Sequence, residues 1–183
     1  MKIFAVYIKV SLTKKPEWFD EFLNKYFEPV DLHITLIQPR YIDENRINDL
    51  QFSIIRIIEN NRLIDKKLVF DKVVVDKGSD GKYICMLIAQ ENDFLVDLQK
   101  ELKKVLKDYS TYVDDSTKEY EIDFKPHITI AINLDESTKE EAEKYFISDY
   151  ECQGEMESLV LPIVKNTSIE ERKDSNNLRI FKL

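Results

Sequence analysis

Two short segments of the chain each carry a histidine followed, two positions later, by a threonine. They read Leu32-His33-Ile34-Thr35-Leu36-Ile37 and Phe124-Lys125-Pro126-His127-Ile128-Thr129-Ile130-Ala131. The two histidines of these segments are the only ones in the sequence. An imidazole can take up or release a proton near neutral pH, and a hydroxyl can donate a hydrogen bond to a charged oxygen. The two segments together therefore carry the groups needed for acid and base catalysis on a substrate that develops charge on oxygen.

Both segments are rich in Ile, Thr and Leu, which favours β-strands. Side chains alternate along a strand, so each His and its Thr share one face, roughly 6 to 7 Å apart. A single segment of this kind would indicate an ordinary strand histidine, in the core or at a sheet edge. Its occurrence at both histidines favours a shared site instead. We expect His33 and His127 on neighbouring strands that line one central cleft.

These residues resemble the motifs of the 2H phosphoesterase superfamily, which includes bacterial and archaeal 2'-5' RNA ligases and cyclic nucleotide phosphodiesterases. That family is defined by two His-x-Thr or His-x-Ser motifs, and its second motif often reads Phe-x-Pro-His-x-Thr. Phe124, Pro126, His127 and Thr129 reproduce the second motif. The resemblance extends over essentially the whole chain, because the separation of the motifs and the total length also fit.

The resemblance implies an α+β fold that is two-lobed and pseudo-symmetric, with mostly antiparallel sheets and outer helices around a central cleft. It implies His33, Thr35, His127 and Thr129 as the catalytic residues. One imidazole would act as base and the other as acid, in an order that the sequence leaves open. The reaction implied is cleavage of a 2',3'-cyclic phosphate, or of a 2'-5' linkage at a nucleotide or RNA end, without metal or cofactor.

Three other functions remain open at this stage. The first is a 2'-5' oligoadenylate or cyclic oligonucleotide phosphodiesterase, and the second is an RNA-end ligase. The third is a catalytically silent RNA- or nucleotide-binding module. Ligase-type relatives often place a basic residue after the second motif, where this chain has Ala131 and Ile132. A zinc site is not favoured, because two histidines without a third ligand rarely suffice.

Further residues are candidates for substrate contact. Lys125 shares the parity of His127 and is a candidate phosphate ligand, with a solvated lysine as the alternative. Tyr7, Tyr41 and Phe124 are candidates for stacking on a base, although packing in the core is the more common role for an aromatic residue of this kind.

Composition limits the possible partners. The chain has 183 residues, 27 basic and 35 acidic, and a formal net charge of -8. Binders of long nucleic acids concentrate basic residues, and no such patch stands out here. The N-terminal apolar run is short for a signal sequence, no segment is long enough to span a membrane, and Cys85 and Cys152 lack ligand spacing. We expect residues 1–183 to form a single cytoplasmic, monomeric domain of two lobes.

Hydrophobic periodicity predicts the elements that must position the motifs. Strands are expected at 3–10, 31–37, 67–75, 82–90, the second motif, 155–165 and 178–183. Pro39 is expected to end the first motif strand, and a hairpin turn is expected at 78–81. Helices are expected at 18–27, 43–60, 93–107 and 137–146, the last opened by a capping box at Ser137. Polar stretches at 108–121 and 166–177 are expected to be loops.

Overall fold

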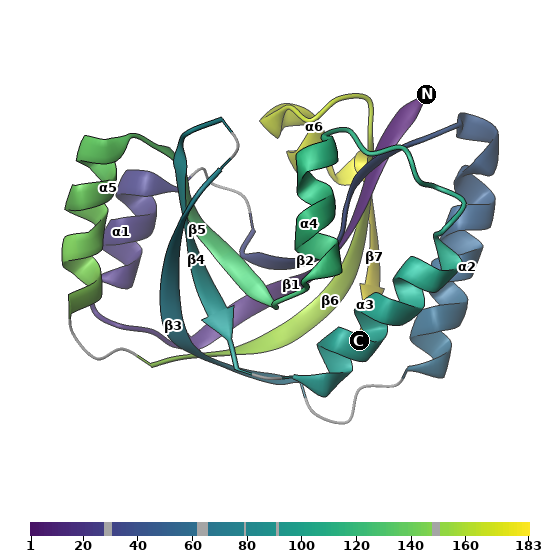
Figure 1. Cartoon of the computed structure of the whole chain (residues 1–183). Helices are drawn as coiled ribbons and strands as arrows, with labels where there is room; N and C mark the ends of the chain where they lie inside the picture. The colour runs from purple at the N-terminus through teal and green to yellow at the C-terminus, as the bar shows by residue number, and fades with distance from the viewer. Residues whose placement is uncertain (28–30, 62–65, 79, 91, 148–150) are drawn as a thin grey trace.

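A curved antiparallel sheet organises the protein (Figure 1). The computed structural model describes residues 1–27, 31–61, 66–78, 80–90, 92–147 and 151–183. Within these ranges the sheet has seven strands in the order β2-β1-β6-β3-β4-β5, with β7 paired to β6. The strands are β1 (Lys2–Lys14), β2 (His33–Ile42), β3 (Lys67–Lys77), β4 (Tyr83–Ala89), β5 (His127–Leu134), β6 (Cys152–Val164) and β7 (Leu178–Lys182).

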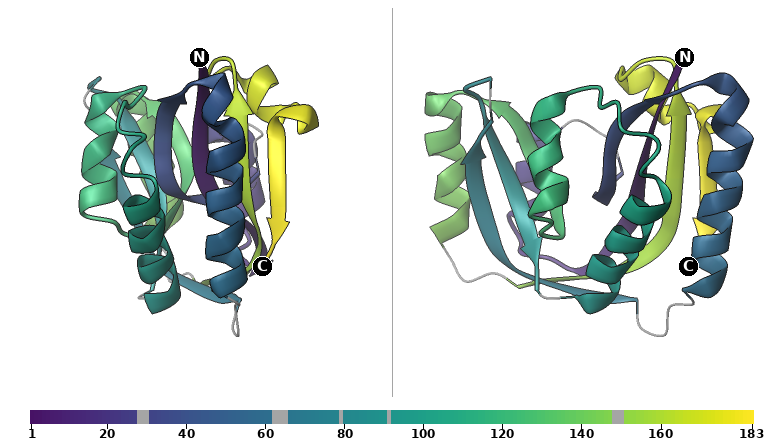
Figure 2. Two further views of the ribbon diagram at one scale, coloured as in Figure 1. Left: turned by 90° about the vertical axis from the view of Figure 1, so that its right-hand side faces the viewer. Right: turned by 45° about the vertical axis from the view of Figure 1, so that its right-hand side comes forward.

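The sheet forks at β6. The start of β6 pairs with β3 over only four residue pairs, from Lys67 opposite Glu155 to Phe70 opposite Cys152. Further along β6, the residues from Ser158 to Pro162 pair with β7 instead. The strands β3, β4 and β5 therefore diverge from β1, β2 and β6, and the sheet bends between the two groups (Figures 1 and 2). The division of this fold into two lobes stays a prediction.

Helices cover the sheet in two groups. The helices are α1 (Phe19–Tyr26), α2 (Ile47–Asn60), α3 (Asp93–Val105), α4 (Lys118–Ile122), α5 (Glu136–Glu143) and α6 (Ile169–Lys173). Short 3-10 turns lie at Glu44–Arg46, Asp115–Thr117, Lys144–Ile147 and Ser175–Asn177. Helices α1 and α5 contact β5, while α2 contacts α3, which packs against β2 (Figure 1). Each half of the chain thus supplies a helix that packs on a strand of the other half.

The apolar periodicity identified the packed faces correctly except at Val105, which was predicted to face the core but is exposed at the end of α3. In α2, Leu50, Ile54 and Ile57 are buried, and in α3 the buried set includes Leu95, Leu98 and Leu102. The predicted α+β class, with an antiparallel sheet and helices packed outside, is confirmed. No helix in the described ranges is long and apolar enough to cross a membrane.

Several predicted boundaries differ from the structure, and two of the differences have a clear physical reason. Strand β2 does not stop before Pro39 but continues to Ile42. Pro39 is tolerated because β2 is an edge strand of the sheet order and its pairing with β1 is irregular at this point. Helix α5 begins at Glu136, because the side chain of Asp135, rather than Ser137, caps it by accepting a hydrogen bond from the Thr138 amide at 2.8 Å.

The two predicted polar loops are also partly wrong. The stretch 108–121 contains a 3-10 turn and most of α4, and the stretch 166–177 contains α6 and a second 3-10 turn. Neither stretch has apolar residues at helical spacing over more than about one turn, which hides helices of this length from periodicity. Local capping determines them instead. Asp114 accepts from the Ser116 amide, and Ser168 accepts from the Glu171 amide.

Candidate active site

The two motifs begin the strands β2 and β5, which stand at the two ends of the sheet order. In β2 the intervening Ile34 and Leu36 are fully or almost fully buried, while His33 and Thr35 are half-buried. The same alternation repeats in β5. The predicted alternation is therefore confirmed, with each His and its Thr on the less buried face of its strand.

Each motif strand pairs with one inner strand in the same way. His33 lies opposite Lys9 and Thr35 opposite Tyr7 on β1. His127 and Thr129 lie opposite Ile88 and Met86 on β4 in the corresponding register. Although β2 and β5 are not hydrogen-bonded to each other, they are in contact, because the sheet bends and brings its two ends together (Figure 1). The motif strands are neighbours in space but not in the hydrogen-bonding order.

Both imidazoles are held by the same local hydrogen bond. The Nδ1 of His33 lies 2.7 Å from the carbonyl oxygen of Asp31, and the Nδ1 of His127 lies 2.7 Å from the carbonyl oxygen of Lys125. A carbonyl oxygen can only accept, so Nδ1–H donates in each case and the neutral ring carries its lone pair on Nε2. Each ring is thereby held in one orientation, and Nε2 is the nitrogen that could exchange a proton.

Burial lowers the pKa of both imidazoles below the ordinary value. For His127 the loss of hydration opposes the charged form, and the hydrogen bond to Lys125 acts weakly the other way. For His33 burial is again the largest cause of the lowered pKa, and the positive charges of Arg172 and His127 add to it. The charge of His127 is the smallest of these influences on the pKa of His33, and it indicates that the two imidazoles lie within electrostatic range of each other.

An aromatic ring lies beside each histidine. The centroid of the Tyr7 ring is 4.6 Å from that of His33, and the Tyr120 ring is 6.2 Å from that of His127. Burial, followed by the charge of Asp31, raises the pKa of Tyr7 to about 12, so its hydroxyl stays protonated near neutral pH. Tyr7 therefore lies at the candidate site, whereas Phe124 packs against the hydrophobic core and the Tyr41 amide bonds to the Thr111 carbonyl.

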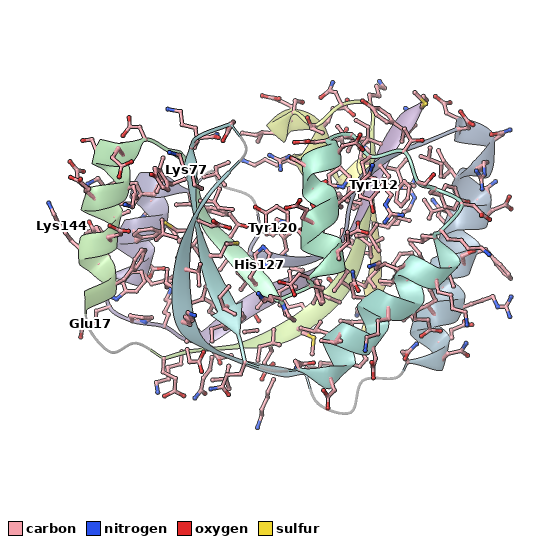
Figure 3. The ribbon with its side chains drawn as sticks, in the orientation of Figure 1. Glu17, Lys77, Tyr112, Tyr120, His127 and Lys144 are labelled. Carbon is pink, nitrogen blue, oxygen red and sulfur yellow. The ribbon has the colours of Figure 1, made fainter. Side chains whose placement is uncertain are left out.

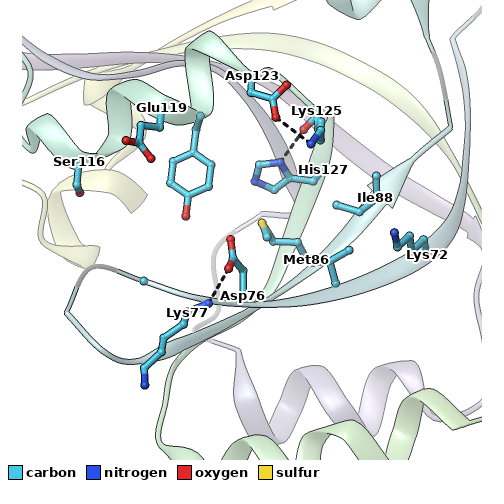
Figure 4. Close-up of a pocket in the computed structure, with 13 residues that line it drawn as sticks. Lys72, Asp76, Lys77, Met86, Ile88, Ser116, Glu119, Asp123, Lys125 and His127 are labelled. Carbon is cyan, nitrogen blue, oxygen red and sulfur yellow. Dashed lines mark hydrogen bonds and ion pairs between the residues drawn. The ribbon is translucent and has the colours of Figure 1, made fainter.

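A cavity of about 730 Å³ opens beside His127, between β3, β4 and α4 (Figure 4). Its volume is within the range of about 300 to 1,000 Å³ typical of small-molecule sites. Two of the predicted site residues, His127 and Lys125, line this cavity. The other three, His33, Thr35 and Thr129, do not line it. A single cleft lined by both imidazoles stays a prediction, supported by the contact between β2 and β5 and by the small effect of the His127 charge on the pKa of His33.

Lys125 lies at the rim of this cavity, where it forms an ion pair with Asp123, with 2.9 Å between Nζ and the carboxylate (Figure 4). Its side chain is 69% exposed. An exposed pair of this kind is worth little, so Lys125 can leave Asp123 for a phosphate at small cost.

Most residues of the cavity were not predicted from the sequence, among them Tyr120 and Asp76. Tyr120 was assigned to a loop, yet it lies on α4 and faces the cavity near His127 (Figure 3). Asp76 lies just beyond the predicted end of its strand, and its side chain also lines the cavity. The parity of β3 was an available signal, because Lys72, Val74 and Asp76 alternate along it and all reach the cavity.

A buried ion pair fixes α4 in place. Arg40 on β2 and Glu121 on α4 are 4% and 2% exposed and form a salt bridge. Glu121 also accepts hydrogen bonds from the Gln38 amide at 2.7 Å and from the Tyr112 hydroxyl at 2.9 Å. Arg40 donates to the Tyr109 carbonyl at 2.9 Å as well. This network ties the helix that carries Tyr120 to the strand that carries His33.

The described residues contain no group of three or more His, Cys, Asp or Glu side chains placed to hold a metal ion. Cys85 and Cys152 are both buried and free. Burial raises the pKa of the Cys85 thiol to about 12, which leaves it protonated and unreactive at neutral pH.

Comparison with known proteins gives a family and a fold. The sequence model of the 2'-5' RNA ligase superfamily matches residues 11–163. The structure of Kluyveromyces marxianus Usb1 with uridine monophosphate is similar, with a TM-score of 0.56 and 10% identity over 99% of this chain and 98% of that chain. Usb1 without a named ligand gives a TM-score of 0.54, also at 10% identity, with the same coverage. E. coli LigT complexed with 3'-AMP gives 0.49 at 14% identity, covering 100% of this chain and 95% of that chain. No curated protein matches the chain.

Proposed function

The chain belongs to the 2'-5' RNA ligase superfamily of 2H phosphoesterases, and we propose that it is a metal-independent phosphodiesterase acting on 2',3'-cyclic phosphates or 2'-5' linkages at nucleotide or RNA ends. The observation that carries the proposal is the matched hydrogen bond of the two imidazoles, Nδ1 to a backbone carbonyl at 2.7 Å in both motifs. It leaves two Nε2 atoms oriented for proton transfer, and one base and one acid are what an in-line displacement at phosphorus needs.

The proposed reaction on a 2',3'-cyclic phosphate proceeds in one displacement. A neutral imidazole accepts a proton at Nε2 from the water that attacks phosphorus. The opposite imidazolium donates its Nε2 proton to the 3'-oxygen of the ribose as the bond from phosphorus to that oxygen breaks. A 2'-phosphate forms, and the two histidines end with exchanged protonation states.

Thr35 and Thr129 are proposed to stabilise the charge that develops on the phosphate. Each shares a strand face with its histidine, two positions along, so its hydroxyl can donate to a non-bridging oxygen while Nε2 reaches a bridging one. The hydroxyls are proposed to contribute less to the rate than the proton transfers do. Their contribution does not depend on pH near neutrality, because a threonine hydroxyl does not titrate there.

Two observations support a short substrate. The net charge of -8 disfavours binding along a long RNA strand. Usb1, which shares the fold, has been solved with uridine monophosphate, which supports a nucleotide as the unit bound. Hydrolysis at a nucleotide or strand end is therefore favoured over ligation of long RNAs.

The test is a panel of substrates incubated with the purified protein in excess EDTA. We expect turnover of nucleoside 2',3'-cyclic phosphates or of 2'-5' linked dinucleotides, whereas 3'-5' linked dinucleotides serve as the control and should stay intact. Turnover only of 2'-5' oligoadenylates or cyclic dinucleotides would favour the signal-degrading alternative. Binding without turnover of any substrate would favour the silent module, and activity that returns only with a divalent ion would overturn metal independence.

The pH profile of kcat/KM is expected to be a bell with its maximum on the acid side of about pH 6.5. Burial lowers the pKa of both imidazoles below that of an ordinary histidine. The imidazolium that acts as the acid therefore loses its proton, and activity falls, already below about pH 6.5 as the pH rises. On the acid side of the maximum, the imidazole that acts as the base becomes protonated, and kcat/KM falls again as the pH is lowered. The cyclic phosphate diester stays monoanionic over this range, so both limbs report the coupled histidine pair. A profile that keeps rising above pH 7 would contradict this assignment.

A further inference from the structure

The cavity beside His127 has three kinds of wall. Tyr120 on α4 supplies an aromatic ring, and Val74, Met86 and Ile88 supply an apolar surface from β3 and β4. Charged groups of both signs stand around this surface (Figure 4). An aromatic ring together with an apolar surface is the usual environment for a planar base, because every base has a π-face that stacks.

The charges of the cavity are balanced. Three lysines and three acidic residues line it: Lys72, Lys77, Lys125, Asp76, Glu119 and Asp123. A site for several phosphates needs an excess of positive charge. Its absence among these lining residues favours a ligand whose neutral part enters the cavity while its single phosphate stays near His127.

The register of the strand pairing places the cavity residues of β3, β4 and β5 in rows that run across the sheet. Lys72, Ile88 and His127 stand opposite one another across β3, β4 and β5, and Val74, Met86 and Thr129 form the next row. Asp76 stands in the row after that, opposite Ile84. Directly opposed residues share a face of the sheet. A nucleotide with its phosphate at the motif residues therefore extends along this face toward Asp76.

The carboxylate of Asp76 points into the cavity (Figure 4). Its Oδ1 accepts a hydrogen bond from the Lys77 amide at 2.8 Å, which fixes the orientation of the group. Its charge is a cause, after burial, of the raised pKa of the Tyr120 hydroxyl, so the carboxylate lies near the aromatic wall. A fixed carboxylate is an acceptor only, and it selects ligands that offer N–H donors.

We propose that the cavity binds the nucleobase of the substrate, and that Asp76 selects bases with an amino group on the Watson–Crick edge over uracil. Adenine, cytosine and guanine each present such a group to an acceptor. Uracil presents one N–H between two carbonyl oxygens, and these repel a carboxylate. The proposal rests on the function proposed above, because it takes the phosphate of the substrate to lie at the two histidines.

The test compares two readouts for the four bases. The first is kcat/KM for the nucleoside 2',3'-cyclic phosphates, and the second is the calorimetric affinity for the 2'-nucleotides, which requires no turnover. We expect the wild type to favour the amino-bearing bases over uracil by about tenfold in both, the ratio that one charge-assisted hydrogen bond gives in a partly solvated site.

The decisive variant is Asp76→Asn. Its side-chain oxygen can keep the Lys77 amide, so the NH₂ group replaces the carboxylate oxygen that faces the cavity. The amide NH₂ group then faces the base as a hydrogen-bond donor. The preference for amino-bearing bases should disappear, or change to a preference for uracil, whose carbonyl oxygens accept from it. Asp76→Ala should abolish the preference without reversing it. The matched control is Asp71→Asn, which removes the same charge from β3 at an exposed position outside the cavity and should keep the wild-type preference.

The outcomes separate the two proposals. Hydrolysis without a base preference, or an equal change in the Asp71 and Asp76 variants, would overturn the role of Asp76 and leave the phosphodiesterase standing. A base preference in calorimetry that Asp76→Asn removes would support the cavity even if no cyclic phosphate were hydrolysed. Failure to bind any of the four nucleotides would overturn the cavity assignment as well.

Discussion

Replacing either His33 or His127 by alanine is expected to lower kcat/KM for the best cyclic substrate by about 10²- to 10⁴-fold. Each substitution removes one of the two Nε2 atoms between which the proposed reaction divides its proton transfers. The matching 2.7 Å bonds of Nδ1 to a backbone carbonyl indicate that the two rings are oriented in the same way. The double variant should therefore lose little more than the worse of the two single variants, because residues that act as a unit are not additive.

The controls for this prediction are on the same strands. Thr35→Ala and Thr129→Ala should each lower kcat/KM by less than the histidine substitution on that strand, since a hydroxyl donor stabilises charge but transfers no proton. Thermal unfolding of each variant checks that the fold is intact. Burial disfavours the charged form of both histidines, so neither contributes a stabilising charge to the fold. Replacing either one should therefore not lower the free energy of unfolding through the loss of a charge. Wild-type activity in either single histidine variant would refute the mechanism.

Replacing Glu121 by alanine is expected to lower the free energy of unfolding by about 3 to 5 kcal/mol, the typical cost of removing one member of a buried ion pair. Arg40 is 4% exposed and would keep its charge without a carboxylate partner. The Gln38 amide and the Tyr112 hydroxyl would lose their acceptor as well. Denaturant unfolding followed by circular dichroism measures the loss.

Two comparisons sharpen this second prediction. Glu119→Ala removes the same charge from the same helix at an exposed position, and its effect should stay within about 0.5 kcal/mol. The double variant Arg40→Met with Glu121→Met should be more stable than Glu121→Ala, because no buried charge is left unpaired. A loss below about 1 kcal/mol for Glu121→Ala would mean that Arg40 finds water or another partner.

The sequence by itself determined the local features of the candidate site. Alternation along β2 and β5 placed each His and Thr on one face, and that depends only on the period of a strand. The buried faces of α2 and α3 followed from the 3.6-residue period in the same way. Both signals are local, because a residue's side of its own element depends on its neighbours in sequence.

Tertiary structure decided what surrounds the motifs. In the sequence, Glu121 is one polar residue in a polar stretch. Its contacts with Arg40, 81 positions away, and with Gln38 hold it in the interior and hold α4 beside the cavity. Likewise, Tyr120 and Asp76 line the same cavity as His127 because α4 and the end of β3 border that cavity from different sides. Even the approach of β2 to β5 depends on the bend of the whole sheet. These arrangements depend on the sum of contacts between segments far apart in the chain, which no local period encodes.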